Sequence, residues 1–338
     1  MLTGLLFVIL GAIAGGSFGL PSKFARKDTP WEVLWGPFFL FVTVLLPVVL
    51  GPLLVKDFWA IYAEVGLGTL LATLVFGFLW GMGSMTLGMS FAFIGLSLAY
   101  ALNYGAQIAF GSMAPKLLLQ PGELLTPGGY VLMAGVAACL VGVVVSGRAA
   151  MLKERSLKTE AAAGAARPPK MLIGVAIGIA SGILCACYAL ACAFSSGVVT
   201  VATTHGNASW SASWAQVALI LWGGAVSACG YCLFKLTKNR TWGHFARPGA
   251  GRILGLAAAM AVLHDGAIFC FNLAINVGDI SVPVAYPVFM SLAIIVGNVH
   301  GFRSGEWRGA SRRSIGWIVA GIAILVAGVC ILGKAMAM

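Results

Sequence analysis

Apolar residues run along this chain in long unbroken stretches, without the alternation that is typical of a half-buried strand. About 20 apolar residues are needed for an α-helix to cross the hydrocarbon core of a bilayer. Backbone groups inside a membrane must bond to one another, so continuous stretches of this length indicate helices and not a barrel. Ten such stretches cover residues 2–22, 32–55, 68–93, 95–118, 127–147, 171–197, 213–235, 252–277, 280–301 and 315–335. The pattern predicts an all-α integral membrane protein with ten transmembrane helices.

Two pairs of these stretches almost touch, and several prolines interrupt others. The third and fourth are separated only around Gly95, and the eighth and ninth meet at Gly278 and Asp279. We expect a tight helical hairpin at each place. Pro47 lies inside the second stretch, where a missing backbone donor is expected to bend the helix.

Composition agrees with a membrane setting. Hydrophobic residues make up 60% of the chain and charged residues 9%. A soluble domain of this length could not cover its surface with so little charge. We therefore expect membrane lipid to surround the protein.

The lysines and arginines fall on alternate connections between the predicted spans. Of the 21 in the chain, 18 lie in the first, fifth, seventh and ninth connections, and only Lys56, Lys116 and Lys334 lie elsewhere. The positive-inside rule places the richer connections in the cytoplasm, and both termini then face the periplasm or the exterior. The net charge of +11 is thus explained by topology. No basic run is long or interleaved with exposed aromatics, so no nucleic-acid partner is expected.

The cysteines give no sign of a disulfide framework or a metal site. All eight lie inside predicted spans, so none is placed to join exposed loops. Cys229 and Cys232 have C-x-x-C spacing, but no second pair accompanies them. Small residues at helix contacts are the ordinary explanation. We expect neither a metal nor another cofactor.

A polar, Ala-rich connection near residues 148–170 ends in Pro168-Pro169 and divides the chain into halves of five spans. We expect a first repeat over 1–150, a cytoplasmic linker over 151–170 and a second repeat over 171–338. Five is an odd number, so the second repeat must enter the membrane from the opposite side. Inverted repeats are typical of secondary transporters, whose substrates bind near the midplane between the halves.

Several segments match a known family. They are Trp31-Glu32-Val33-Leu34-Trp35, Asp57-Phe58-Trp59-Ala60-Ile61-Tyr62, Phe76-Gly77-Phe78-Leu79-Trp80-Gly81-Met82-Gly83, Leu152-Lys153-Glu154-Arg155 and Glu306-Trp307. The chain resembles the bacterial L-rhamnose–proton symporter family over nearly its whole length. That family belongs to the drug/metabolite transporter superfamily, so the resemblance implies two inverted five-helix repeats in a bacterial inner membrane. It also implies that the protein imports L-rhamnose or a similar deoxy-sugar by symport with a proton.

Two carboxylates are candidates for carrying the proton. Asp265 lies in the middle of the eighth span, where burial of a charge costs a few kcal/mol and is expected to keep the group protonated. Glu32 begins the second span beside Trp31 and Trp35, in one of the segments that resemble the family. The alternatives are a structural hydrogen bond for Asp265 and a favourable helix-dipole interaction for Glu32.

A sugar site needs groups that pair with hydroxyls and an aromatic platform in a mostly apolar cavity. Polar residues at i, i+4 spacing share a helix face. The candidates from the third, fourth and eighth spans are Trp80, Ser84, Tyr100, Asn103, Gln107, His264, Asn272 and Asn276. We expect a cavity between the halves lined by these three spans. Hydrogen bonding between helices is the alternative for each polar stripe.

Two other functions are compatible with this pattern. The protein could import or export a different small polar metabolite. An integral-membrane enzyme is the alternative class, but the chain has no H-E-x-x-H, G-x-S-x-G or Walker A sequence.

Overall fold

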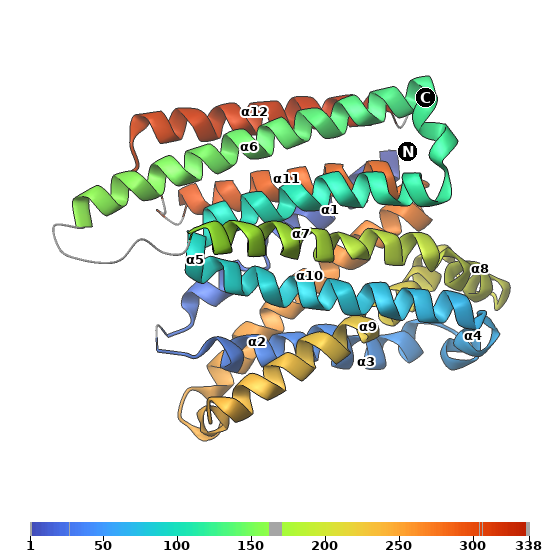
Figure 1. Ribbon diagram of the computed structural model, residues 1–338. Coiled ribbons are helices and arrows are strands. Elements are labelled where there is room, and N and C mark those ends of the chain that lie inside the picture. Colours follow the sequence, from blue (N-terminus) through green and yellow to red (C-terminus); the bar gives the residue numbers. More distant parts are fainter. Residues whose placement is uncertain (1, 27, 162–170, 304, 306, 336–338) are drawn as a thin grey trace. The chain divides into compact units, whose positions relative to one another are not determined.

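The computed structural model describes residues 2–26, 28–161, 171–303, 305 and 307–335, and Figure 1 shows their arrangement in helices without strands. Four elements are short 3₁₀ or π segments: η1 (Leu20–Phe24), η2 (Phe41–Leu45), η3 (Pro121–Leu125) and η4 (Trp242–Ala246). The α-helices are α1 (Leu2–Ser17), α2 (Trp31–Leu40), α3 (Leu46–Leu54), α4 (Phe58–Glu64), α5 (Leu67–Leu119), α6 (Pro127–Ala161), α7 (Met171–Phe194), α8 (Ser196–Thr204), α9 (Ser209–Lys238), α10 (Ala250–Asn276), α11 (Val282–Arg303) and α12 (Arg312–Ala335).

The prediction of an all-α integral membrane protein is confirmed at this level. Nine helical segments in the described part of the chain are long and apolar enough to cross a membrane. They correspond to nine of the ten predicted spans. The remaining one, 95–118, falls in the second part of α5, where several side chains lie outside the described residues. The tenth span and the inverted repeat stay predictions.

Helix α5 is assigned without a break over 53 residues, yet it cannot be straight. A Cβ atom on Gly83 would lie 2.5 Å from the backbone nitrogen of Cys185. Asn103 also contacts this turn of α7, because its amide donates to Ser181 Oγ at 2.8 Å. Twenty residues of straight helix would hold Gly83 and Asn103 about 30 Å apart. The helix therefore reverses its direction between them, as the expected hairpin around Gly95 requires.

The second predicted span is a composite of α2, η2 and α3. The π segment η2 lies directly before Pro47, the second residue of α3. Proline has no N–H to donate within the helix, so the preceding turn widens where that bond is missing. Thr43 in η2 bonds back to the carbonyl of Phe39 at 2.8 Å, which satisfies its hydroxyl. The span therefore continues through this point without a loop.

The chain forms two compact units, and each draws helices from both halves of the sequence. The first unit comprises residues 1–82 and 190–280. Within it α1 packs along α10, and α2 and α3 pack against α9. Glycines allow close approach of helices: a Cβ on Gly278 would collide with the Cα of Gly4. This unit contains α4, α8 and the beginning of α5.

The second unit comprises residues 83–189 and 281–338. Its main contact joins α6 and α12, which lie side by side in Figure 1. A Cβ on Gly142 would lie 2.8 Å from the side chain of Leu325, and one on Gly328 would lie 2.6 Å from Cys139 Sγ. Helix α6 continues to Ala161, so the first part of the expected linker is helical. The rest of the linker, 162–170, lies outside the described residues, and the division into repeats stays a prediction.

Candidate functional site

The carboxylate of Asp265 is buried in the middle of α10, and its residue is only 3% exposed. Oδ1 lies 3.2 Å from Nδ1 of the neighbouring His264. Oδ2 is buried and has no hydrogen-bond partner among the described residues. A buried carboxylate oxygen without a partner is costly unless it is protonated or a ligand supplies a bond. The pair therefore has one open bonding position.

Three aromatic rings surround the imidazole of His264. The ring centroids of Phe18 and Phe38 lie 5.3 and 5.5 Å from it, both edge-on, and that of Trp80 lies 5.8 Å away. The rings come from the residue directly after α1, from α2 and from the first part of α5. Edge-to-face contacts of this kind fix the plane of a ring. The histidine is thus held in one orientation beside Asp265.

The indole of Trp80 reaches this position because α9 offers a glycine beneath it. A Cβ on Gly224 would lie 2.6 Å from the six-membered ring of Trp80. Trp80 is 6% exposed, so its ring is almost fully enclosed. The aromatic platform and the ionisable pair predicted from separate spans therefore meet within the first unit.

Asn272 and Asn276 lie further along α10 in a different polar network. Asn276 donates to Gln216 Oε1 at 2.8 Å, and Gln216 donates to Ser195 Oγ at 2.9 Å. The thiol of Cys192 donates to Asn272 Oδ1 at 3.7 Å. These bonds join α10 to α9 and to the break between α7 and α8. They are the contacts that the interhelical alternative predicts, and a substrate role for both asparagines stays a prediction.

Asn103 and Gln107 belong to a buried chain of hydrogen bonds in the second unit. Tyr286 Oη donates to Gln107 Oε1 at 2.8 Å, and Gln107 Nε2 donates to Asn103 Oδ1 at 2.6 Å. Asn103 in turn donates to Ser181. The ring of Tyr286 fits because Gly111 faces it without a Cβ. The shared face expected from the i, i+4 spacing is confirmed, whereas binding of a sugar there stays a prediction.

Two further candidates lie in the second unit. Ser84 adjoins Gly83, the residue that packs on the backbone of Cys185. Tyr100 is helical, but its side chain lies outside the described residues. Ser84 also forms a side-chain hydrogen bond with Cys185, and a substrate role for both candidates stays a prediction.

Glu32 is buried at the start of α2 and does not join His264 and Asp265 in a hydrogen bond. Its Oε1 accepts bonds from Asn239 Nδ2 at 2.8 Å and from Thr241 Oγ1 at 3.1 Å. Both donors lie just after α9 ends, in the seventh connection. The carboxylate therefore ties the start of α2 to the end of α9.

Sequence reasoning missed several residues that complete these networks. Gln216 is the only Gln, Asn or charged residue between Trp214 and Gly224, a signal that could have singled it out. Tyr286 carried no clear signal, since a lone tyrosine in an apolar span is more often a packing residue. Phe18 and Phe38 carried no signal, since an aromatic in an apolar span is ordinary packing.

The arrangement can hold and release a proton in an apolar surrounding, next to a flat aromatic surface. No group of three His, Cys, Asp or Glu side chains in the described ranges could hold a metal ion. An ionisable pair inside a membrane helix marks a path for ions or substrate. Candidate membrane-spanning helices with an ionisable pair buried in one of them are typical of a multi-pass membrane transporter.

Comparison with known proteins identifies the family of transporters to which the chain belongs. The family model described as "L-rhamnose-proton symport protein (RhaT)" matches residues 1–338, and the chain belongs to this family. A relative from Pectobacterium atrosepticum, named L-rhamnose-proton symporter, is 24% identical and covers 100% of this chain and 98% of its own. Relatives of the same name from Salmonella typhi and Cronobacter sakazakii are 25% and 26% identical, over 99% of this chain and 98% and 97% of theirs.

Proposed function

We propose that this protein imports L-rhamnose, or a closely similar deoxy-sugar, together with a proton, as a secondary active transporter of a bacterial inner membrane. Family membership over the whole chain supports the substrate and the coupling ion. We further propose ten spans in two inverted repeats, as in the drug/metabolite transporter superfamily. Both termini would then face the periplasm.

One observation carries the proton-coupled mechanism. Asp265 has one oxygen bonded to His264 and one buried oxygen without a partner among the described residues. Protonation would remove the cost of burying a charge and leave an O–H on that oxygen, which can donate to a ligand. When the site opens to the less acidic cytoplasm, water reaches the carboxyl and the proton can leave. A proton taken up outside is thereby released inside.

The rings around His264 suit a deoxy-sugar. A 6-deoxy-hexose has hydroxyls on some edges and an apolar methyl group on another. In a state that opens this enclosed site, the face of Trp80 can stack on the C–H groups of the pyranose, and Phe18 and Phe38 offer apolar contact for the methyl group. The protonated carboxyl of Asp265 can donate from Oδ2 to a sugar hydroxyl. Sugar and proton would then bind together, which is the requirement for symport.

Purified protein in liposomes tests the proposal. We expect labelled L-rhamnose to accumulate above its outside concentration when the outside is acidic, and only to equilibrate when a protonophore collapses the gradient. L-Fucose, the 6-deoxy-galactose, should compete more weakly if the hydroxyl pattern is read. Equal accumulation with and without the gradient would overturn proton coupling. Accumulation of an unrelated small polar metabolite instead would favour the alternative substrate class.

A further inference from the structure

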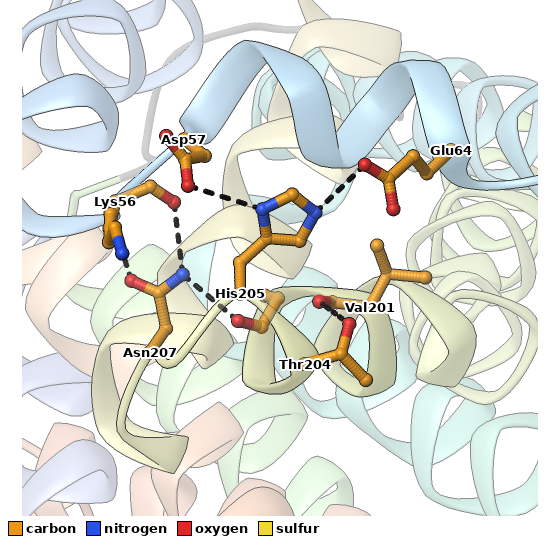
Figure 2. A network of polar contacts seen from close by, with 8 residues as sticks. Lys56, Asp57, Glu64, Val201, Thr204, His205 and Asn207 are labelled. Atoms are coloured by element: carbon orange, nitrogen blue, oxygen red, sulfur yellow. Dashed lines mark hydrogen bonds and ion pairs between the residues drawn. The ribbon is translucent and has the colours of Figure 1, made fainter.

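A second ionisable cluster lies away from His264 and Asp265, where the second and sixth connections meet. His205 ends α8, and its two ring nitrogens face two carboxylates from the other connection (Figure 2). Nδ1 lies 3.2 Å from Asp57 Oδ2, and Nε2 lies 3.0 Å from Glu64 Oε1. Asp57 directly precedes α4 and Glu64 is its last residue. One imidazole thus bridges both ends of a seven-residue helix.

The end of α8 is built to present this histidine. Gly206 follows with a φ of +81°, a conformation that suits glycine. The N–H of Gly206 bonds to Thr203 O at 2.9 Å, and that of Asn207 bonds to Ala202 O at 3.3 Å. This pair of bonds is a Schellman motif, which ends a helix with defined geometry. His205 and Asn207 therefore leave α8 in fixed directions toward the connection before α5.

Asn207 provides a second contact that does not depend on pH. Its Oδ1 accepts from the backbone N–H of Lys56 at 2.7 Å, and its Nδ2 donates to the Lys56 carbonyl at 3.0 Å. Within α4, Phe58 and Ile61 are buried, and Tyr62 Oη donates to Ala215 O at 2.8 Å. The start and middle of α4 are thus held by uncharged groups. Only its last residue, Glu64, depends on His205.

The double contact requires a charged imidazole. A neutral histidine has one N–H and one lone pair, so only one of its nitrogens can donate to a carboxylate. The lone pair of the other nitrogen would then face a carboxylate oxygen, and the two would repel each other. The nitrogens lie on opposite sides of the ring and each meets a different carboxylate, so a single metal ion could not engage both pairs. The geometry suits an imidazolium between two anions.

No other ionisable side chain of the packed elements competes for His205. Helix α8 has no Asp, Glu, Lys, Arg or His, and α9, which packs on α8, has none before Lys235. The segment from residue 55 to 66 contributes Asp57, Glu64 and Lys56, whose backbone meets Asn207. Hydrogen bonds from His205, first to Asp57 and then to Glu64, raise its pKa above the ordinary value.

We propose that His205 is a pH-sensitive clasp: its imidazolium fastens the Glu64 end of α4 to α8, and loss of its proton frees that end. A raised pKa means that the stabilisation is complete below the ordinary histidine value of about 6.5 and is lost as the pH rises through the raised value. Helix α4 leads directly into α5, which carries Trp80. Release at Glu64 would loosen the start of α5, the helix that carries Trp80 further along its length.

The predicted topology places both connections on the outer face, where bulk pH changes most. The clasp itself needs neither sugar nor a proton gradient. Its effect on transport rests on the proposed function, whereas its pH dependence does not. An experiment can therefore contradict the clasp without contradicting the proposed transport function, and the reverse is also true.

Hydrogen exchange of the full-length protein, read by mass spectrometry on peptides covering residues 58–66, tests the clasp. After correction for the chemical exchange rate, we expect protection to fall about two- to fivefold between pH 5.5 and 8.5, the size typical of an exposed ion pair. His205→Arg keeps a planar cation at every pH, so protection should stay high throughout. His205→Gln should show the low, alkaline level at both pH values.

Controls make the result specific. His244→Gln changes a histidine in η4 of the seventh connection and should leave the wild-type profile. Glu64→Gln should lower protection at pH 5.5 to the alkaline level, and it tests the same contact if His205→Gln does not fold. Parallel pH profiles for the wild type and His205→Arg would overturn the proposal. So would full acid protection in a folded His205→Gln protein.

Discussion

Asn239 donates a hydrogen bond to Glu32 at 2.8 Å across 207 positions of sequence, and Thr241 donates to the same oxygen at 3.1 Å. One carboxylate oxygen thus holds the start of α2 against the end of α9 by two hydrogen bonds. Its partners are fixed neutral groups, and both belong to the segment that caps α9. This is the geometry of a structural tie.

We therefore predict that Glu32→Gln keeps uphill sugar accumulation within about twofold of the wild type, because its amide oxygen can still accept both bonds. Glu32→Ala removes the acceptor of both bonds; because Asn239 is exposed and Thr241 is half-buried, water can replace it, and the free energy of unfolding should fall by about 1 kcal/mol for each lost bond. Liposome uptake and thermal unfolding in detergent measure the two effects. If Glu32→Gln exchanges sugar but no longer concentrates it, Glu32 and not Asp265 carries the proton.

Helix α5 crosses α9 so closely that Gly77 and Gly223 meet. A Cβ on Gly77 would collide with the carbonyl oxygen of Ile220 and lie 3.2 Å from the Cα of Gly223. Gly77→Ala must push two backbones apart, and we expect it to cost about 1–3 kcal/mol of stability. Gly68 in the same helix has no atom within 4 Å of an added Cβ. Gly68→Ala should be neutral or stabilise by up to about 1 kcal/mol.

Thermal unfolding of both variants in the same detergent gives the comparison. The sign of the difference is the test, because detergent shifts both midpoints alike. Equal midpoints for Gly77→Ala and Gly68→Ala would show that the α5–α9 crossing can widen without cost.

The spans could be predicted from the sequence because burial in lipid is a matter of length and polarity. Boundaries of α9, α10 and α11 differ from the predicted stretches by at most a few residues. The first part of the linker is helical where a connection was predicted, because it is rich in Ala, Glu, Lys and Arg, all good helix formers. This helical part ends at Ala161. Helix α4 was missed, since its seven residues are too short to show a period.

Part of the candidate site could be predicted from the sequence, because polarity within a span is also easy to recognise. Asp265 and His264 are conspicuous because charge is rare in a span, but the three rings that hold His264 come from segments far apart in sequence. Their meeting depends on how α1, α2 and α5 pack on α10, and an apolar span carries no signal for its neighbours. The clasp at His205 was missed because connections were read only for their lysines and arginines.

Topology provides a prediction that needs no transport assay. Eighteen of 21 basic side chains lie on the connections that we place in the cytoplasm. A Cβ atom at Gly122 would have no other atom within 4 Å, so a cysteine there is open to reagents. Gly122→Cys should therefore react with a membrane-impermeant maleimide in intact cells. Ser156→Cys should react only after the cells are permeabilised. Reaction of Ser156→Cys from outside would contradict the orientation, and the parent protein gives the background of its own cysteines.

The role of Asp265 can be separated from the role of the sugar site. Asp265→Asn keeps the size of the side chain and imitates the protonated, neutral carboxyl. The variant can still bind sugar and move it across the membrane, but no proton is released at the end of the cycle. We expect sugar exchange within a few fold of the wild type, with accumulation against a gradient abolished.

Two measurements on the same liposomes decide this. Counterflow of labelled against unlabelled L-rhamnose reports exchange, and uptake driven by an acidic exterior reports coupling. His264→Gln is the companion variant: it retains a donor toward Asp265 Oδ1 but cannot carry charge, so it should weaken coupling less than Asp265→Asn does. If Asp265→Asn still concentrates the sugar, the buried carboxyl of Asp265 in α10 is structural, and the proton must travel by another carboxylate.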